Sequence, residues 1–194
     1  MKKVNRKELA NKVGVLSCAH HAWLVSSRRM GDKMARAIDE MAYYDLYVPI
    51  DKNGFITSME SAAHIIIHMH GTPEALFDQR EGGEIPKMLT IADIEAMPDF
   101  KEARLVFLTA CSAAGGDPNR NVASALSKKI AKDGLVIANE YTVWGEDHDF
   151  GDKEGRRGWV GYRDGKRIIT KEKIPAKITP ADAYIIYKNA HRYV

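Results

Sequence analysis

The chain contains little cysteine and no long hydrophobic run. Only Cys18 and Cys111 are cysteines among its 194 residues, whereas small disulfide-stabilised secreted domains are rich in cysteine. No apolar segment reaches the roughly 18 residues that a membrane-spanning helix needs. Residues 1–25 begin with basic side chains, but polar residues interrupt the apolar stretch that a cleavable secretory signal requires. We therefore expect free thiols, no membrane partner, and a cytoplasmic protein or one exported without such a signal.

The chain also lacks a strong excess of charge of either sign. It has 29 basic and 26 acidic residues and a net charge of +3, which is too small to indicate a nucleic-acid partner. Hydrophobic residues make up 45% and charged residues 28%, which is typical of a globular protein with a substantial core. No repeat, low-complexity tract or linker divides the sequence, so residues 1–194 are predicted to form a single domain.

Apolar runs alternate with helical patterns along most of the chain. The short apolar runs predict strands at 13–17, 44–50, 63–69, 103–110 and 135–139. The helical spacings predict helices at 26–42, 91–97 and 121–133, the last ending at Gly134. This alternation predicts an α/β fold with a mostly parallel sheet that is covered by helices on both faces.

The carboxyl-terminal part of the chain has a different pattern. The glycine-rich, charged segment 145–161 predicts a loop, and Asp164-Gly165 predicts a hairpin turn. Pro180 predicts the start of a final helix. Residues 155–194 are therefore expected to add a late hairpin, in which Trp159 packs, and a carboxyl-terminal helix.

Two strand ends carry residues suited to nucleophilic catalysis. The run HIIIHMHG (64–71) ends in His70-Gly71, and the run 103–110 is followed by Cys111. The carboxyl ends of neighbouring parallel strands lie at one edge of a sheet, so these residues should be close together. A cysteine nucleophile needs a nearby base and hydrogen-bond donors for the oxyanion. His70 can move the proton, and the N–H groups of Gly71 and Cys111 can serve as the donors.

The two segments AHIIIHMHG (63–71) and ARLVFLTACSAAGG (103–116), in this order, resemble the caspase-like cysteine peptidases. The intervening residues and the later KDGLVIANEYTVWGED are most similar to the bacterial CHAT domains of that superfamily. The resemblance implies a caspase-like three-layer αβα sandwich with Cys111 as nucleophile, His70 as proton carrier, and Gly71 and Cys111 N–H as the oxyanion hole. It implies a protein or peptide substrate and no cofactor. An activating protein partner is a further expectation.

The resemblance also predicts where the substrate binds. The primary specificity pocket of the family lies between segments that correspond to 15–20 and 138–144 here, so Cys18, Glu140 and Trp144 are expected to be substrate-binding. An acidic residue in the pocket, such as Glu140, would favour Lys or Arg before the cut. The alternative is that Glu140, Asp147 and Asp149 are solvated loop charges.

The dibasic pair Arg156-Arg157 permits two interpretations. It lies in the glycine-rich segment that is predicted to be a loop, and many relatives of the caspase-like family process themselves in such loops. The pair is therefore either a self-cleavage site or part of a solvated loop.

Two further hypotheses compete with a cysteine peptidase. His64, His68 and His70 have even spacing and would share one face of a strand, as ligands of a metal-dependent hydrolase would. Segments 18–21 and 148–149 could supply further ligands, but no complete ligand set at a familiar spacing is present, so no metal is predicted. The other hypothesis is an inactive caspase-like binding or regulatory module, in which Cys111 is a buried thiol. The presence of both His70 and Cys111 argues against it.

Overall fold

The computed structural model of the chain describes residues 15–17, 55–56, 59–60, 63–68, 70–77, 88–146 and 149–192. The described strands are β1 (Val15–Ser17), β2 (His64–His68), β3 (His70–Gly71), β4 (Ala75–Phe77), β5 (Met88–Thr90), β6 (Leu105–Leu108), β7 (Leu135–Asn139), β8 (Val143–Glu146), β9 (Asp149–Asp152), β10 (Trp159–Arg163), β11 (Lys166–Ile169) and β12 (Lys177–Ile178). The described helices are α4 (Ile91–Glu95), α5 (Val122–Ser127) and α6 (Pro180–Lys188), with short 3-10 turns at Lys171–Lys173 and Ala190–Arg192. The helix predicted at 26–42 and the strand predicted at 44–50 lie outside the described residues.

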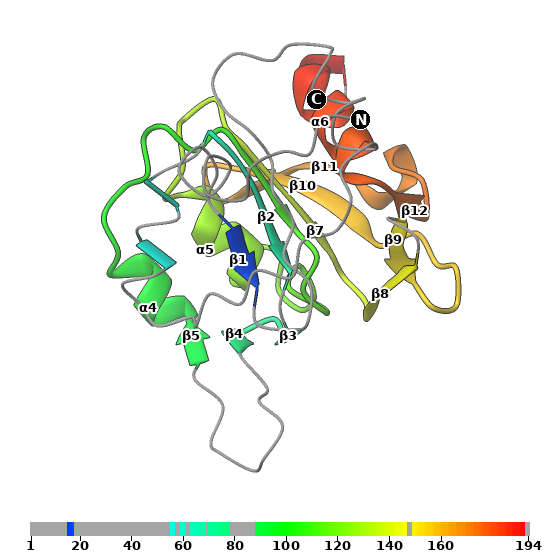
Figure 1. Cartoon of the computed structure of the whole chain (residues 1–194), viewed down its shortest axis with the longest axis horizontal. Coiled ribbons are helices and arrows are strands. Elements are labelled where there is room, and N and C mark those ends of the chain that lie inside the picture. Colours follow the sequence, from blue (N-terminus) through cyan, green and yellow to red (C-terminus); the bar gives the residue numbers. More distant parts are fainter. Residues whose placement is uncertain are drawn as a thin grey trace, which may run out of the picture.

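A six-stranded mixed sheet forms the centre of the fold (Figure 1), with the strand order β1-β2-β6-β7-β10-β11. The strands from β1 to β7 in this order are parallel to their neighbours. β10 is antiparallel to β7, and β11 is antiparallel to β10. The prediction of an α/β protein is therefore confirmed. The predicted apolar runs form the parallel strands of the sheet. The hairpin at Asp164-Gly165 adds the antiparallel strands β10 and β11 at one edge.

Apolar side chains cover both faces of this sheet. Successive residues of a strand point to opposite faces, and β6 illustrates the consequence. Val106 and Leu108 belong to the core that includes α4 and α5, whereas Leu105 and Phe107 belong to the core that includes α6. A strand that is buried on both faces must be apolar throughout, which explains why β6 reads as a continuous hydrophobic run.

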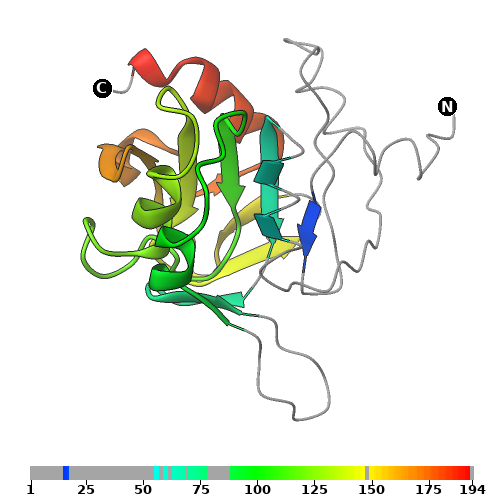
Figure 2. The same ribbon diagram turned by 90° about the vertical axis from the view of Figure 1, so that its left-hand side faces the viewer.

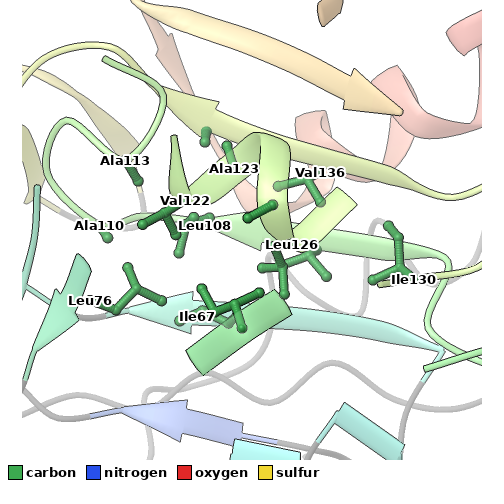
Figure 3. Packing of buried hydrophobic residues seen from close by; sticks show 14 of the residues in the cluster. Ile67, Leu76, Leu108, Ala110, Ala113, Val122, Ala123, Leu126, Ile130 and Val136 are labelled. Atoms are coloured by element: carbon green, nitrogen blue, oxygen red, sulfur yellow. The ribbon is translucent and has the colours of Figure 1, made fainter. Parts of the chain in front are cut away.

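Figure 3 shows the core between α5 and the sheet. Side chains from α5 (Val122, Ala123, Leu126) pack with side chains from the strands (Ile67, Leu108, Val136), and all of them are buried. Leu76 and Ala110 extend this core to the carboxyl ends of the strands. Close packing at that end restricts how the segment after β6 can move.

The helix α5 is shorter than predicted. Asn121 caps it, because its side chain accepts a hydrogen bond from Ser124 N at 2.8 Å, as expected for an asparagine N-cap. The helix ends at Ser127 and not at the predicted Gly134. The following residues bond to another segment: Phe100 N donates to Lys129 O, and Ala131 N donates to Ala103 O. These bonds replace the helical ones and end the helix early.

The prediction of a loop over 145–161 was wrong. This segment contains the β8–β9 hairpin and the start of β10, and β12-β9-β8 form a separate sheet. Two buried aromatic side chains anchor it, since Trp159 Nε1 donates to Phe150 O at 3.1 Å. A Cβ at Gly151 would lie 2.6 Å from Ala176 O. The glycine therefore marks a close approach between strands and not a loop.

The three-stranded sheet β3-β4-β5 and the last helix, α6, lie at opposite ends of β2. Figures 1 and 2 both show α6 near the start of β2 and the sheet β3-β4-β5 near its end. α6 begins at Pro180, as predicted, and Thr179 and Asp182 form a capping box. None of the described helices combines the length and the apolarity that a bilayer crossing requires.

Candidate functional site

The two predicted strand ends meet. β2 and β6 are parallel neighbours with Ile67 opposite Leu108, so both chains leave the sheet at the same edge. A Cβ on Gly71 would lie 2.9 Å from Ala110 Cβ and 2.9 Å from Cys111 O. Only glycine fits at such a close approach of two backbones. The sequence prediction that His70-Gly71 and Ala110-Cys111 lie together is confirmed.

His70 is not on the same strand as His64, contrary to the prediction of a shared face. β2 ends at His68, and β3 begins at His70 in a different sheet, where His70 is opposite Phe77 of β4. The His70 ring stacks on the Phe77 ring, with centroids 5.7 Å apart and an interplanar angle of 18°. The orientation of this imidazole therefore depends on the pairing of β3 with β4. It does not follow from the alternation of side chains along β2.

Cys111 begins a tight turn after β6. Its thiol is free and partly exposed, and Sγ donates a hydrogen bond to Val143 O at 3.7 Å. Ser112 has a φ of 53°, a left-handed conformation that costs free energy for a residue with a Cβ. Ser112 N donates to Tyr141 O at 2.8 Å. The backbone beside the thiol is therefore strained and is held by residues 141–143.

The two candidate catalytic side chains have separate partners. Among the described residues, no hydrogen bond joins the His70 imidazole and the Cys111 thiol, because His70 stacks on Phe77 and Cys111 donates to Val143. Transfer of the thiol proton to His70 requires the thiol to leave Val143 O. Among the described residues, no backbone acceptor is found for the N–H of Cys111.

Glu140, a predicted substrate-binding residue, is already paired. Its side chain is 14% exposed, and its carboxylate contacts Arg167 Nη2 at 2.8 Å and Lys171 Nζ at 3.0 Å. Hydrogen bonds to Glu140 and to the Tyr141 hydroxyl raise the pKa of Lys171. A basic substrate side chain would have to displace one of these cations. The structure therefore does not present Glu140 as a free carboxylate for Lys or Arg.

Trp144, the other described residue of the predicted pocket, is exposed near the cysteine. It directly follows Val143, the acceptor of the thiol hydrogen bond, and its side chain is 55% exposed. Lys153 Nζ lies 5.6 Å from its ring centroid. The indole ring is therefore partly open to solvent, with Lys153 over it.

Several predicted site residues cannot be placed. Cys18, Asp147 and His148 lie outside the described residues, as do the side chains of β1 and of His68. Asp149 is exposed at the start of β9. Within the described ranges, no group of three or more His, Cys, Asp and Glu side chains is arranged to hold a metal ion.

His64 is a structural residue at the other end of β2. Its ring lies edge-on to Tyr184 and Tyr187 of α6, with centroids 5.3 and 5.8 Å away. Its Nδ1 is buried and has no hydrogen-bond partner among the described residues. Burial, assisted by the positive charges of Lys188 and Arg104, lowers the pKa of His64 from 6.5 to about 4.

Two residues with a role near the cysteine were not found from the sequence. Tyr141 accepts the Ser112 N–H, and the Arg156 guanidinium lies 4.2 Å from the Tyr141 ring centroid. Arg156 was considered only as half of a dibasic cleavage site. Its neighbour Arg157 donates from Nη1 to Glu172 O at 2.8 Å. The ion pair of Arg156 with Asp152 forms across a turn after β9, and both this pair and the position of Arg156 against Tyr141 depend on the fold.

A comparison of the sequence with protein-family models and with curated protein sequences finds no match to either. The resemblance to caspase-like peptidases therefore depends on the motifs and their order alone.

Proposed function

We propose that the chain is a cysteine endopeptidase with a caspase-like fold, closest in pattern to CHAT domains, that uses Cys111 as nucleophile and His70 as base and acid. The observation that supports this most is the approach of Gly71 to the backbone of Cys111. It brings the His-Gly and Ala-Cys segments to one point at the carboxyl edge of a parallel sheet, where α/β proteins bind ligands. We expect this function in the cytoplasm and without a cofactor.

The proposed reaction begins when His70 accepts the thiol proton of Cys111. The thiolate then attacks the peptide carbonyl carbon, and the resulting oxyanion accepts hydrogen bonds from the N–H groups of Gly71 and Cys111. The C–N bond breaks as His70 donates its proton to the leaving amine. Water, deprotonated by His70, hydrolyses the thioester and releases the carboxylic acid and the thiol.

The substrate of this reaction is a protein or peptide. The pairing of Glu140 with two cations does not support the predicted preference for Lys or Arg. Trp144 is exposed and directly follows Val143, the acceptor of the thiol hydrogen bond, which supports an apolar or aromatic contact with the substrate.

Labelling with an iodoacetamide probe at neutral pH, mapped by mass spectrometry, tests the dyad. We expect faster labelling of Cys111 than of Cys18 in the wild type and slower labelling of Cys111 in His70→Ala. Cleavage of a fluorogenic peptide library by the wild type and its loss in Cys111→Ala would support the peptidase. Equal, slow labelling of both cysteines in both proteins, together with no cleavage, would reject it.

A second candidate function is an inactive caspase-like binding module. The hydrogen bond from the Cys111 thiol to Val143 O and the stacking of His70 on Phe77 favour it, because each side chain interacts with a residue other than its proposed catalytic partner. For such a module, Cys111→Ala would retain partner binding, whereas Trp144→Ala would weaken it.

A further inference from the structure

The segment 140–143 restrains Cys111 and the residue after it. Val143 O accepts the thiol hydrogen bond, and Tyr141 O accepts the Ser112 N–H at 2.8 Å. Since Ser112 is in a left-handed conformation with a φ of 53°, the bond to Tyr141 helps to retain a backbone geometry that would otherwise relax. The position of Tyr141 therefore influences the position of the sulfur.

Two cations hold the Tyr141 side chain. The Arg156 guanidinium carbon lies 4.2 Å from the ring centroid, within the range of a cation–π contact. Lys171 Nζ is farther from the centroid, at 5.6 Å, and hydrogen-bonds the Tyr141 hydroxyl at 3.3 Å. Arg156 thus holds the face of the ring, and Lys171 holds its hydroxyl end.

Asp152 fixes Arg156 over the ring. The Asp152 carboxylate accepts hydrogen bonds from Arg156 Nε and Nη2, both at 2.9 Å, a two-point geometry that a lysine cannot make. Its Oδ2 also accepts from the backbone N–H groups of Glu154 and Arg156. Asp152 is only 2% exposed, and the hydrogen bonds from Arg156 lower its pKa. The buried Asp152 carboxylate therefore fixes the orientation of the Arg156 guanidinium.

The same segment packs tightly behind the ring. A Cβ on Gly158 would lie 2.7 Å from Tyr141 Cδ2, and Glu140 N donates to Gly158 O at 2.9 Å. Residues 152–158 therefore contact the 140–143 segment at the ring and at the backbone. A shift of one segment must move the other, because such close packing leaves no space for an independent displacement.

We propose that Arg156 is a positioning residue for Cys111, which acts through Tyr141. The stacked guanidinium fixes the Tyr141 ring, and the ring fixes the carbonyls of residues 141 and 143 that restrain Ser112 and the thiol. Arg156 touches neither the sulfur nor a substrate, so its role is indirect. The inference rests on the proposed role of Cys111 as the nucleophile.

Site-resolved labelling of the full chain with iodoacetamide tests the proposal, with Cys18 as the internal reference. In Arg156→Ala we expect Cys111 to be labelled faster relative to Cys18 by about threefold or more, the factor for loss of one weak hydrogen bond. Arg156→Lys keeps a cation beside Asp152 and should fold as the wild type does, with an intermediate rate. Arg157→Ala is the matched control, because it removes the neighbouring arginine from an exposed bond to Glu172 O, and it should label as the wild type does.

Two further variants separate the ring face from the hydroxyl. Tyr141→Phe keeps the ring under Arg156 and should label as the wild type does, whereas Tyr141→Leu should label as Arg156→Ala does. Where peptide cleavage is observed, Arg156→Ala should change kcat and leave KM unchanged, because Arg156 acts on the position of the sulfur and touches no substrate. A wild-type rate in both Arg156 variants, an equal effect of Arg157→Ala, or equal acceleration at both cysteines would overturn the proposal. If labelling changes as expected and no peptide is cleaved, the peptidase function fails and the positioning role stands.

Discussion

His64 begins β2 and His70 follows its end, yet their surroundings differ. The His64 ring packs edge-on against two tyrosines of α6, and burial favours its neutral form. His70 is partly exposed, stacks on one phenylalanine, and lies beside the segment that carries Cys111. The His64 ring packs edge-on against two other rings, and its Nδ1 has no hydrogen-bond partner among the described residues, which suits a packing role. For His70, beside Cys111, we propose a role in proton transfer. The comparison teaches that position in the tertiary structure, and not residue type, decides the surroundings of each imidazole.

The largest expected difference between the two ends is in activity. His70→Ala should lower kcat for peptide hydrolysis by about 10²–10⁴-fold, the usual contribution of a general base and acid. His64→Phe should leave kcat within about twofold of the wild type, because the His64 ring packs on α6 at the end of β2 opposite His70. Steady-state kinetics on a cleaved peptide measures both. Equal losses in the two variants would remove the distinction between the ends.

The second difference concerns two tightly packed glycines. A Cβ at Gly71 would approach Ala110 and Cys111, and a Cβ at Gly134, at the start of β7, would lie 2.8 Å from Ala131 O and 2.8 Å from Ile130 Cδ1. Each alanine substitution should cost about 1–3 kcal/mol in free energy of unfolding, as for other overpacked sites. Only Gly71→Ala should also change the labelling rate of Cys111.

Urea unfolding and cysteine labelling of the two variants provide the measurement. A Gly134→Ala protein with altered Cys111 reactivity would show that strain spreads along the whole sheet. The two ends would then not be independent.

The third difference is in pH dependence. The pKa of His64 is about 4 in the folded state, below its ordinary 6.5, so the unfolded chain binds the proton more tightly. Its contribution to stability is therefore complete above about pH 6.5 and is lost as the pH falls toward 4. After allowance for partial exposure, we expect a loss of about 1–2 kcal/mol across this window.

Denaturant midpoints between pH 4 and 7 in the wild type, in His64→Phe and in the exposed-histidine control His191→Gln test this assignment. The slope should weaken in the His64 variant and persist in the control. An unchanged slope in His64→Phe would assign the acid sensitivity to other groups.

The smallest expected effect on stability concerns Trp144, near the candidate site. Because Trp144 is exposed, Trp144→Ala should change the free energy of unfolding by less than about 0.5 kcal/mol. It should raise KM several-fold and change kcat little, since a flat apolar face contributes to binding. Trp159→Ala is the contrasting variant, because Trp159 is fully buried and its loss should cost about 3–5 kcal/mol. A Trp144 variant with unchanged KM would remove this residue from the substrate site.

The sequence predicted the parallel strands well and the late strands poorly. β7 has the predicted bounds, and β2 and β6 lie within their predicted runs, because strands buried on both faces must be apolar throughout. The segment 145–161 was misread because its glycines and charges are typical of a loop. Its strands pair with strands outside the segment, since β9 pairs with β12 and β10 pairs with β7. Such pairing between separate segments leaves little local signal.

The candidate site was predicted in part. The meeting of Gly71 with Cys111 followed from the rule that parallel strands end at one edge. The free carboxylate expected at Glu140 was not found, because Arg167 and Lys171 reach it from a hairpin and a later turn.

The sequence by itself determined the parallel strands, the α/β class, and the order in which His70 and Cys111 leave neighbouring strands. Local apolar patterns and strand direction were sufficient for these. Only the tertiary structure decided that the Cys111 thiol bonds Val143 O, that Ser112 is left-handed, and that Arg156 covers Tyr141. Each of these depends on a contact between separate segments of the chain or on a backbone angle that packing imposes. Neither can be read from the order of the residues.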